Sequence, residues 1–204
     1  RHKVLLIVDE IPNTLGRTGH WFSFEEFGIE PDIICLGKGL GGGVVPFAAL
    51  ITRDRFNQAA AISLGHYTHE KSPIGCAAAL ATIETIREAG LLAKAQEDGR
   101  FMAAELGKLA ERHPLIGQVR GIGLLWALDL VVDHQSRTRN SQAAERLLYR
   151  CLELGLSFKV SQGNVIQLSP PLNIARADLV RAITILDRAL GEIALSPKQE
   201  HHHD

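Results

Sequence analysis

Two short runs of apolar residues constrain the fold of this chain more than any other feature of its sequence. Residues 4–8 (VLLIV) and residues 33–36 (IICL) contain no alternation of apolar and polar side chains. Continuous runs of this kind are typical of strands that are covered on both faces within a parallel sheet. The first run ends in Asp9-Glu10 and the second in Gly37-Lys38. The pattern predicts an α/β fold with polar residues at the carboxyl ends of its strands, where α/β proteins bind ligands.

The rest of the chain mixes strand and helix patterns. A third apolar run at 44–51 predicts a strand, although Pro46 interrupts it. Apolar spacing predicts helices at 73–89, 91–112, 142–154 and 175–193, and strands at 124–132, 156–160 and 165–168. The polar stretch 133–141 predicts a loop or hairpin tip.

Composition and charge exclude several classes of protein. The chain has 204 residues, of which 46% are hydrophobic and 22% charged, and this balance is that of a globular protein with a buried core. Its formal net charge of -1 gives no general attraction for nucleic acid or for an anionic membrane. The chain contains no apolar run long enough to cross a membrane and no signal-peptide pattern, so we expect a cytoplasmic protein.

The three cysteines and the paired histidines carry little functional signal. Cys35, Cys76 and Cys151 are odd in number and lack metal-type spacing, so we expect reduced thiols rather than a disulfide framework. His66 and His69 are three positions apart, but Pro73 and the lack of a nearby carboxylate ligand argue against zinc.

Lys38 is the best candidate for a catalytic residue in this sequence. It follows a predicted buried strand and stands within the glycine-rich segment 37–43. A desolvated lysine amine is a nucleophile that can form a Schiff base with a carbonyl or with pyridoxal phosphate. Asp9, at the end of the other run, could then serve as the carboxylate partner of the pyridine nitrogen. Taken alone, a lysine beside glycines is more typical of an exposed loop.

Two better-known phosphate motifs do not fit the same segment. Residues 37–42 match G-x-G-x-x-G, but an apolar run with Pro46 follows instead of the helix that a dinucleotide fingerprint requires. A P-loop is excluded because Lys38 is followed by Gly39 rather than by serine or threonine.

Taken together, these segments resemble the class III pyridoxal-phosphate aminotransferases. Asp9-Glu10 followed by Gly16-Arg17-Thr18-Gly19 resembles the family segment D-E-V-Q-T-G-F-G-R-T-G, and residues 31–43 resemble the cofactor-lysine segment. Asp9 and Lys38 are 29 positions apart (38 minus 9), as the family pattern requires. The resemblance extends over the chain to about Leu195.

The resemblance implies a fold and a division into domains. Residues 1–90 would be the later part of the fold-type-I large domain, a mostly parallel sheet with helices that binds the cofactor. Residues 91–195 would form a small C-terminal α/β domain, and residues 196–204 a tail in which three histidines read as a tag remnant. The chain would then correspond to the later part of a longer enzyme.

The resemblance also implies roles for individual residues. Lys38 would be the Schiff-base lysine that moves the substrate proton, and Asp9 the partner of the pyridinium nitrogen. Ile11 matches a family valine that packs on one ring face. Thr68 matches the threonine that binds the cofactor phosphate of a neighbouring subunit, which implies a homodimer with shared active sites.

Two positions depart from the family pattern. Pro12 stands where the family has a glutamine whose amide approaches the phenolic oxygen of the cofactor, and proline has no N–H to donate. Asn13, Thr14 or water would have to replace that donor. Gln167 stands where many aminotransferases have an arginine that binds the substrate α-carboxylate. We therefore expect a substrate without an α-carboxylate in that pocket, unless Gln167 is an ordinary strand residue that faces solvent.

The function implied is amino-group transfer from an amine or ω-amino acid to a keto acid or aldehyde. A racemase, an epimerase or an elimination lyase, for example on a phosphorylated amine, would use the same scaffold. A folded chain without cofactor binding or activity is the third alternative. Asp129 and Asp133 fit strand-end and loop positions better than an acid/base pair, and for Arg120 we expect a structural salt bridge.

Overall fold

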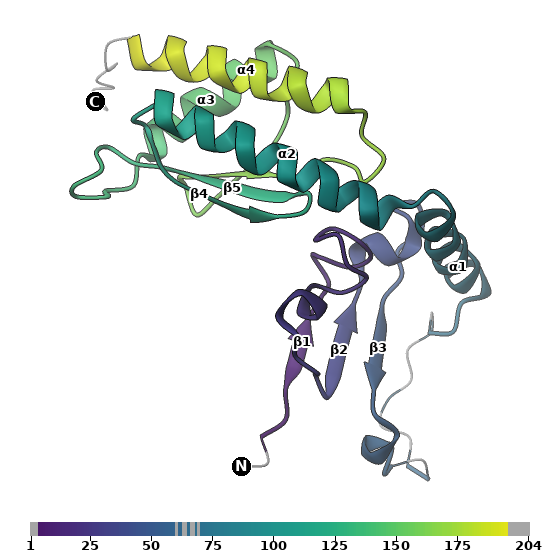
Figure 1. The fold of residues 1–204 in the computed structure, drawn as a ribbon. Coiled ribbons are helices and arrows are strands. Elements are labelled where there is room, and N and C mark those ends of the chain that lie inside the picture. The colour runs from purple at the N-terminus through teal and green to yellow at the C-terminus, as the bar shows by residue number, and fades with distance from the viewer. Residues whose placement is uncertain (1–3, 60, 63–64, 66–67, 69, 196–204) are drawn as a thin grey trace. The chain divides into compact units, whose positions relative to one another are not determined.

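The computed structural model describes residues 4–59, 61–62, 65, 68 and 70–195. The chain divides into two compact units, Arg1–Ala95 and Gln96–Asp204 (Figure 1). The first unit carries the glycine-rich segment, and the second contains the larger apolar core.

The first unit is built on a three-stranded sheet in the order β1-β2-β3. Its elements are β1 (Ile7–Asp9), η1 (Ser23–Phe27), β2 (Ile33–Leu36), η2 (Lys38–Gly41), β3 (Ala49–Thr52), η3 (Asp54–Phe56) and α1 (Pro73–Glu88). Strand β1 runs parallel to β2, with Asp9 opposite Cys35, and β3 runs antiparallel to β2. Helix α1 begins where the Ser72 hydroxyl accepts a hydrogen bond from the N–H of Gly75, and it packs against η2.

The strand predicted at 33–36 is confirmed, whereas the one predicted at 44–51 begins only at Ala49. Gly42 and Gly43 adopt left-handed φ angles of 68° and 75°, and Pro46 follows, so the chain turns before it becomes extended.

The prediction that residues 4–8 are covered on both faces is wrong. Strand formation starts at Ile7, which is 58% exposed, and Val4 is 81% exposed. Covering a strand requires another layer on the sheet, and α1 packs against η2 instead.

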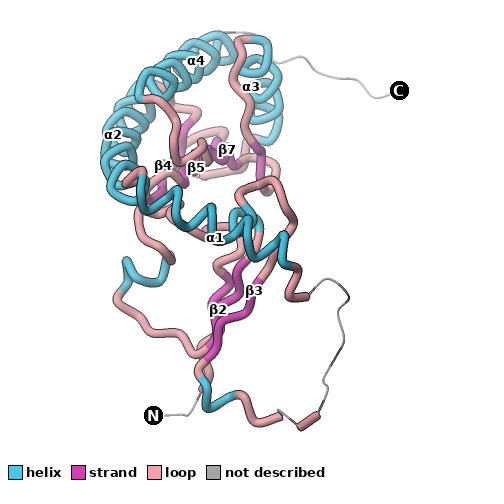
Figure 2. The backbone as a smooth tube through the Cα atoms, turned by 90° about the vertical axis from the view of Figure 1, so that its right-hand side faces the viewer, coloured by secondary structure: helices cyan, strands magenta, loops and turns pink. Residues whose placement is uncertain are grey.

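The second unit combines a four-stranded antiparallel sheet with helices. Its elements are α2 (Leu91–Arg112), which begins in the first unit, β4 (Ile116–Ile122), β5 (Leu125–Leu130), α3 (Ser141–Glu153), β6 (Lys159–Ser161), β7 (Val165–Leu168) and α4 (Arg176–Leu195). The strand order is β4-β5-β7-β6. Helices α2, α3 and α4 surround one side of the sheet (Figure 2). The other elements overlap the helices and strands that the apolar pattern predicts, but β4 was not predicted, because the pattern indicated a strand only at 124–132.

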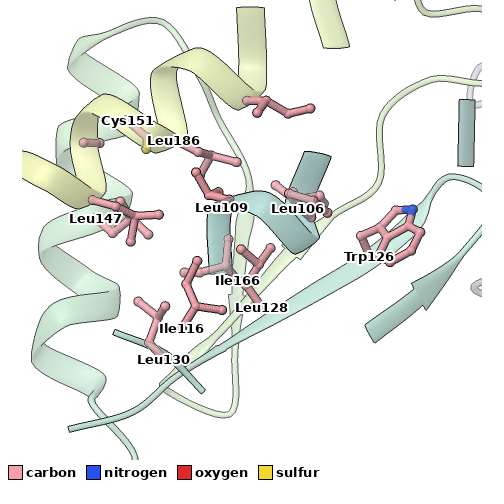
Figure 3. Packing of buried hydrophobic residues seen from close by; sticks show 14 of the residues in the cluster. Leu106, Leu109, Ile116, Trp126, Leu128, Leu130, Leu147, Cys151, Ile166 and Leu186 are labelled. Atoms are coloured by element: carbon pink, nitrogen blue, oxygen red, sulfur yellow. The ribbon is translucent and has the colours of Figure 1, made fainter. Parts of the chain in front are cut away.

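The core of the second unit follows from alternation in the strands and helical spacing in the helices. Trp126, Leu128 and Leu130 alternate along β5 and are all buried. They meet apolar stripes on the helices, which include Leu106 and Leu186, and these side chains converge between helices and sheet (Figure 3). Each fully buried leucine contributes about 2 kcal/mol of favourable transfer free energy.

An ion pair between a buried aspartate and an exposed arginine joins two of these helices. The Asp98 side chain on α2 is 2% exposed, and its Oδ1 accepts a hydrogen bond of 2.9 Å from Nε of Arg176 at the start of α4. Because a buried carboxylate is costly unless it is paired, this contact fixes how the two helices begin to pack.

Candidate functional site

Two sequence-predicted residues, Asp9 and Lys38, lie at the same edge of the first sheet. Asp9 is the last residue of β1, and Lys38 follows β2 after Gly37. Because β1 and β2 are parallel, with Asp9 opposite Cys35, both strands deliver their next residues to one side (Figure 1). This is the edge at which α/β proteins bind ligands.

The Asp9 carboxylate is held by the chain that follows it. Its Oδ1 accepts a hydrogen bond of 2.9 Å from the backbone N–H of Ile11. Its Oδ2 has no hydrogen bond within the described residues, and the residue is exposed. One oxygen is therefore oriented by the backbone while the other can accept a hydrogen bond from a ligand.

Ile11 connects the two strand ends. Gly37 has an extended backbone, and a Cβ placed on it would lie 3.2 Å from Cγ2 of Ile11. Only glycine lets the lysine loop approach the Ile11 side chain this closely without displacing it. The apolar side chain of Ile11 thus forms a wall beside the backbone that carries Lys38.

Lys38 has a left-handed backbone, with φ at 42°, and it begins the short helix η2. Non-glycine residues seldom adopt this conformation, and such strain is concentrated at functional sites. The desolvation expected for Lys38 is not found, because its side chain is exposed and the surrounding glycines offer no side chains to cover it.

Lys38 and Ile11 line the same cavity, which has a volume of about 900 Å³. Apolar residues of β2 and of the segment before β3, among them Phe47, form most of its lining. Glu70 and Lys71 supply the other charged groups. The cavity therefore combines an apolar surface with an accessible lysine amine at the strand ends.

Glu10, which the sequence argument did not single out, anchors the loop after β1. It is 1% exposed, and its Oε1 accepts a hydrogen bond of 3.1 Å from the N–H of Phe24. Its carbonyl oxygen accepts hydrogen bonds from the N–H of Asn13 and, at 2.5 Å, from the Thr14 hydroxyl. The signal available in the sequence was a glutamate directly after an apolar strand, but its burial depends on the fold of the whole loop.

This anchoring bears on the donor that replaces the family glutamine at Pro12. The only proton of the Thr14 hydroxyl is donated to the carbonyl oxygen of Glu10, and Thr14 is buried. Of the two side chains expected from the sequence, Asn13 therefore remains as the possible donor.

The other two sequence-predicted site residues are not among those that line this cavity. Thr68 lies in a turn, is exposed and does not line it. Gln167 belongs to the second unit, where it lies on β7 and its Oε1 accepts a hydrogen bond of 3.3 Å from the Ser161 hydroxyl. It lines a separate, mostly apolar cavity of about 290 Å³.

The alternatives set aside in the sequence have mixed outcomes. His66 and His69 lie outside the described residues, and among the residues that are described no group of three potential ligands could hold a metal ion. The salt bridge expected for Arg120 is confirmed, since its guanidinium pairs with Asp129. Asp133 is a loop carboxylate whose pKa is lowered, first of all by the hydrogen bond from the Ser136 hydroxyl.

The residues at the sheet edge fit pyridoxal phosphate. An exposed lysine amine can bond to its aldehyde, an uncommitted carboxylate oxygen on Asp9 can accept from its ring nitrogen, and Ile11 offers an apolar wall for the ring. The close packing of Gly37 on Ile11 keeps these groups together.

Comparisons with known proteins agree with this chemistry. The family model described as Aminotransferase class-III matches residues 1–190. An (R)-1-hydroxy-2-aminoethylphosphonate ammonia-lyase of Vibrio splendidus is 58% identical over 95% of this chain. A leucine/methionine racemase of Thermococcus litoralis is 42% identical over 94%, and a 5-aminovalerate aminotransferase of Pseudomonas putida is 34% identical over 95%.

Solved structures show the same likeness. An (S)-enantioselective omega-transaminase from Thermomicrobium roseum matches 95% of this chain with a TM-score of 0.87 at 29% identity, and the match covers 44% of that protein. The three relatives named above are covered over 40%, 43% and 46% of their own lengths. The chain thus spans less than half the length of the proteins it matches.

Proposed function

This chain belongs to the class III aminotransferase family, and we propose that it acts as a pyridoxal-phosphate-dependent transaminase. It would move an amino group from an amine or ω-amino acid to a keto acid or aldehyde. The observation that carries the proposal is the delivery of Asp9 and Lys38 to one edge of the parallel pair β1 and β2.

The side chains at that edge would each have a different role. When bound, pyridoxal phosphate supplies an electron-withdrawing ring that stabilises the charge left on a substrate carbon. The Lys38 amine would hold the cofactor and then carry the proton to and from the substrate carbon. The Asp9 carboxylate, oriented by the Ile11 N–H, would keep the ring nitrogen protonated, and the Ile11 side chain would support one ring face.

Thr68 is proposed to bind the cofactor phosphate of a neighbouring subunit, as its match to the family threonine implies. Its exposed position in a turn, away from the lining of the Lys38 cavity, is compatible with a contact to another chain. The protein would then be a homodimer with shared active sites.

The substrate proposal rests on Gln167. A neutral amide cannot form the bidentate ion pair that an arginine forms with an α-carboxylate. We therefore propose a substrate whose reacting carbon carries no carboxylate at that position. The half-buried Gln167 side chain, bonded to Ser161, would contact the substrate through its amide.

Elimination of ammonia is the second candidate. The Vibrio splendidus relative, which acts as an ammonia-lyase on an aminophosphonate according to its name, is 58% identical, against 34% for the 5-aminovalerate aminotransferase. A phosphonate substrate has no α-carboxylate either, so Gln167 is compatible with both reactions.

Two measurements test these proposals. The first is cofactor binding: a visible absorbance band should appear when pyridoxal phosphate is added to the protein and should be absent in Lys38→Ala. No band in the parent protein would contradict cofactor binding.

The second measurement identifies the products of the reaction. A transaminase needs an acceptor and yields an amino acid from an added keto acid. A lyase breaks the carbon–nitrogen bond and releases ammonia from (R)-1-hydroxy-2-aminoethylphosphonate without any acceptor. Inversion of an amino acid without either product would indicate a racemase.

The remaining proposals concern organisation and location. Residues 1–90 would be the later part of a cofactor-binding domain and residues 91–195 a small C-terminal domain. A reducing, cytoplasmic location is supported by Cys35, Cys76 and Cys151, which are all free thiols. Among the described residues, none of the helices has the length and apolar character needed to span a membrane.

A further inference from the structure

A polar pocket lies on the second unit, at residues to which the transaminase proposal gives no role. Its volume is about 170 Å³, and β4, β5, the loop after β5 and the turn before β7 contribute to it. Three of the residues that line it are arginines, namely Arg120, Arg137 and Arg139. The pocket is on the sheet face that alternation turns away from the buried core, since Leu128 and Leu130 point to the helices and Asp129 does not.

The charges in this pocket do not balance. Arg120 is paired with Asp129, and its Nη1 also donates to the Gln118 side chain at 3.3 Å. Arg137 and Arg139 are exposed and make no ion pair or side-chain hydrogen bond within the described part of the chain. Three arginines against one aspartate leave two positive charges without a counterpart, and guanidinium groups satisfy such a deficit by binding oxyanions through paired N–H donors.

The backbone holds these donors in place. Arg137 and Gln162, which both line the pocket, have left-handed φ angles of 53° and 50°. Arg139 pairs with Val131 in an isolated β-bridge, which ties the loop to the end of β5. Strained backbone conformations of this kind persist only where the surrounding structure imposes them, and they are concentrated at ligand sites.

The floor of the pocket is buried and closely packed. Asn164 is 5% exposed, and its Nδ2 donates a hydrogen bond of 3.0 Å to the carbonyl oxygen of Leu130. The register of β4 shifts between Ile116 and Gln118, and a Cβ on Gly117 would lie 2.6 Å from Cγ1 of Val131. The glycine at this irregularity lets β4 and Val131 approach closely, so the pocket has a closely packed base beneath the arginine side chains.

We propose that this pocket binds a small, multiply charged oxyanion of the phosphate type. Two unpaired guanidinium groups match the charge of a phosphate or phosphonate dianion, and the amides of Gln118 and Gln162 can donate further hydrogen bonds. The volume admits a small anion, and a net charge of -1 offers no general attraction for a long polyanion. The anion could be free phosphate or the charged end of a small organic molecule.

The test is a titration of the whole chain with inorganic phosphate and, separately, with methylphosphonate at constant ionic strength. We expect saturable shifts of the backbone amide signals of Gly117, Gln118 and Gln162 in nuclear magnetic resonance spectra. Arg137→Ala and Arg139→Ala should each weaken binding about tenfold. Tighter binding of methylphosphonate would identify an organic ligand as the source, and tighter binding of phosphate would identify the free ion.

Arg181→Ala is the matched control, because Arg181 is an exposed arginine of the same unit that does not line the pocket. It should leave the affinity unchanged. The proposal is overturned if the pocket amides do not shift, or if Arg181→Ala weakens binding as much as Arg137→Ala does. Arg137→Lys and Arg139→Lys keep the charge and give a second measurement should an alanine variant fold poorly. The result is independent of the transaminase proposal, because its readout is confined to the second unit.

Discussion

At the scale of single residues, Asp9 shows how a short contact can prepare a side chain for a ligand. One carboxylate oxygen accepts from the Ile11 N–H, and the other makes no hydrogen bond in the described structure. An asparagine could keep the first contact through its amide oxygen, but it would lose the charge. A substitution by asparagine at this position therefore separates the contribution of the hydrogen bond to the loop from the contribution of the charge.

We expect Asp9→Asn to retain pyridoxal phosphate and to slow turnover at least about a hundredfold, because the ring nitrogen loses its ion pair. Absorbance and steady-state rates measure the two quantities. Asp54→Asn, which changes an exposed carboxylate elsewhere in the first unit, should alter neither of them. Near-normal turnover of Asp9→Asn would remove Asp9 from its proposed role.

Cys151 provides a second residue-scale prediction. Its side chain is fully buried in the core, and burial raises the pKa of its thiol to about 12. Iodoacetamide at pH 8 should therefore modify the exposed Cys76 in the native protein and reach Cys151 only after unfolding in urea. Mass spectrometry of the labelled peptides is the measurement, and modification of Cys76 and Cys151 at equal rates in the native state would contradict it.

At the scale of elements, α1 is joined to the Lys38 cavity through one close contact. Gly75 lies in the first turn of α1, and a Cβ on it would come within 2.4 Å of Cδ2 of Phe47. Phe47 lines the cavity together with Lys38. The packing of the helix thus sets the position of an aromatic ring in the wall of the candidate site.

Gly75→Ala should lower the free energy of unfolding by about 1–3 kcal/mol, because the cost of overpacking exceeds the gain in helix propensity. Gly107→Ala is the matched control: Gly107 lies within α2, and a Cβ there meets no atom within 4 Å. That variant should be stabilised by about 0.5–1 kcal/mol. Urea unfolding measures both, and a stabilised Gly75→Ala would show that the ring moves without cost.

The contact between α3 and α4 leads us to expect that the stability of the fold depends on pH. Glu192 accepts hydrogen bonds from Arg150 and, at 2.8 Å, from Arg188, and these lower its pKa to about 2 from an ordinary value of 4.5. A carboxylate with a depressed pKa stabilises the fold above its unfolded pKa, and the contribution is lost as the pH falls through the folded pKa. The stabilisation should therefore be complete above about pH 4.5 and disappear towards pH 2.

The check is a comparison of Glu192→Gln with the parent protein in urea at pH 7 and pH 2. The variant should be less stable at pH 7, and the two proteins should converge at pH 2. High salt should reduce the difference, since the group is partly exposed. Glu145→Gln, an exposed change on α3, should behave like the parent at both pH values. A difference that persists at pH 2 would mean that packing, not charge, is responsible.

The sequence patterns predicted the positions of helices and strands better than the contacts and the burial of individual residues. The segment 91–112 coincides with α2 because Leu91, Ala95 and Met102 repeat at helical spacing, which is a local property. The antiparallel pairing of β3 and the approach of Gly37 to Ile11 depend on contacts between distant parts of the chain. Periodicity carries no information on such contacts, and the same holds for the burial of Glu10 and the exposure of Lys38.

At the scale of the whole molecule, the two units differ in how their strands are buried. In the second unit, Leu128 and Ile166 are fully buried at the centre of one apolar cluster. In the first unit, Ile7 on β1 is 58% exposed and Leu50 on β3 is 63% exposed. Local stability follows buried apolar contact, so the second unit should resist opening more strongly.

Hydrogen exchange followed by mass spectrometry tests this difference. Peptides that cover β5 and β7 should exchange only through global unfolding, whereas those that cover β1 and β3 should exchange earlier, through openings that leave the second core intact. Because the buried cluster is drawn entirely from residues 102–193, a chain of residues 96–195 should keep the slow exchange of β5. Equal protection of β1 and β5 would show instead that the exposed strands of the first unit are covered in solution, and association with another polypeptide would then be the source of their stability.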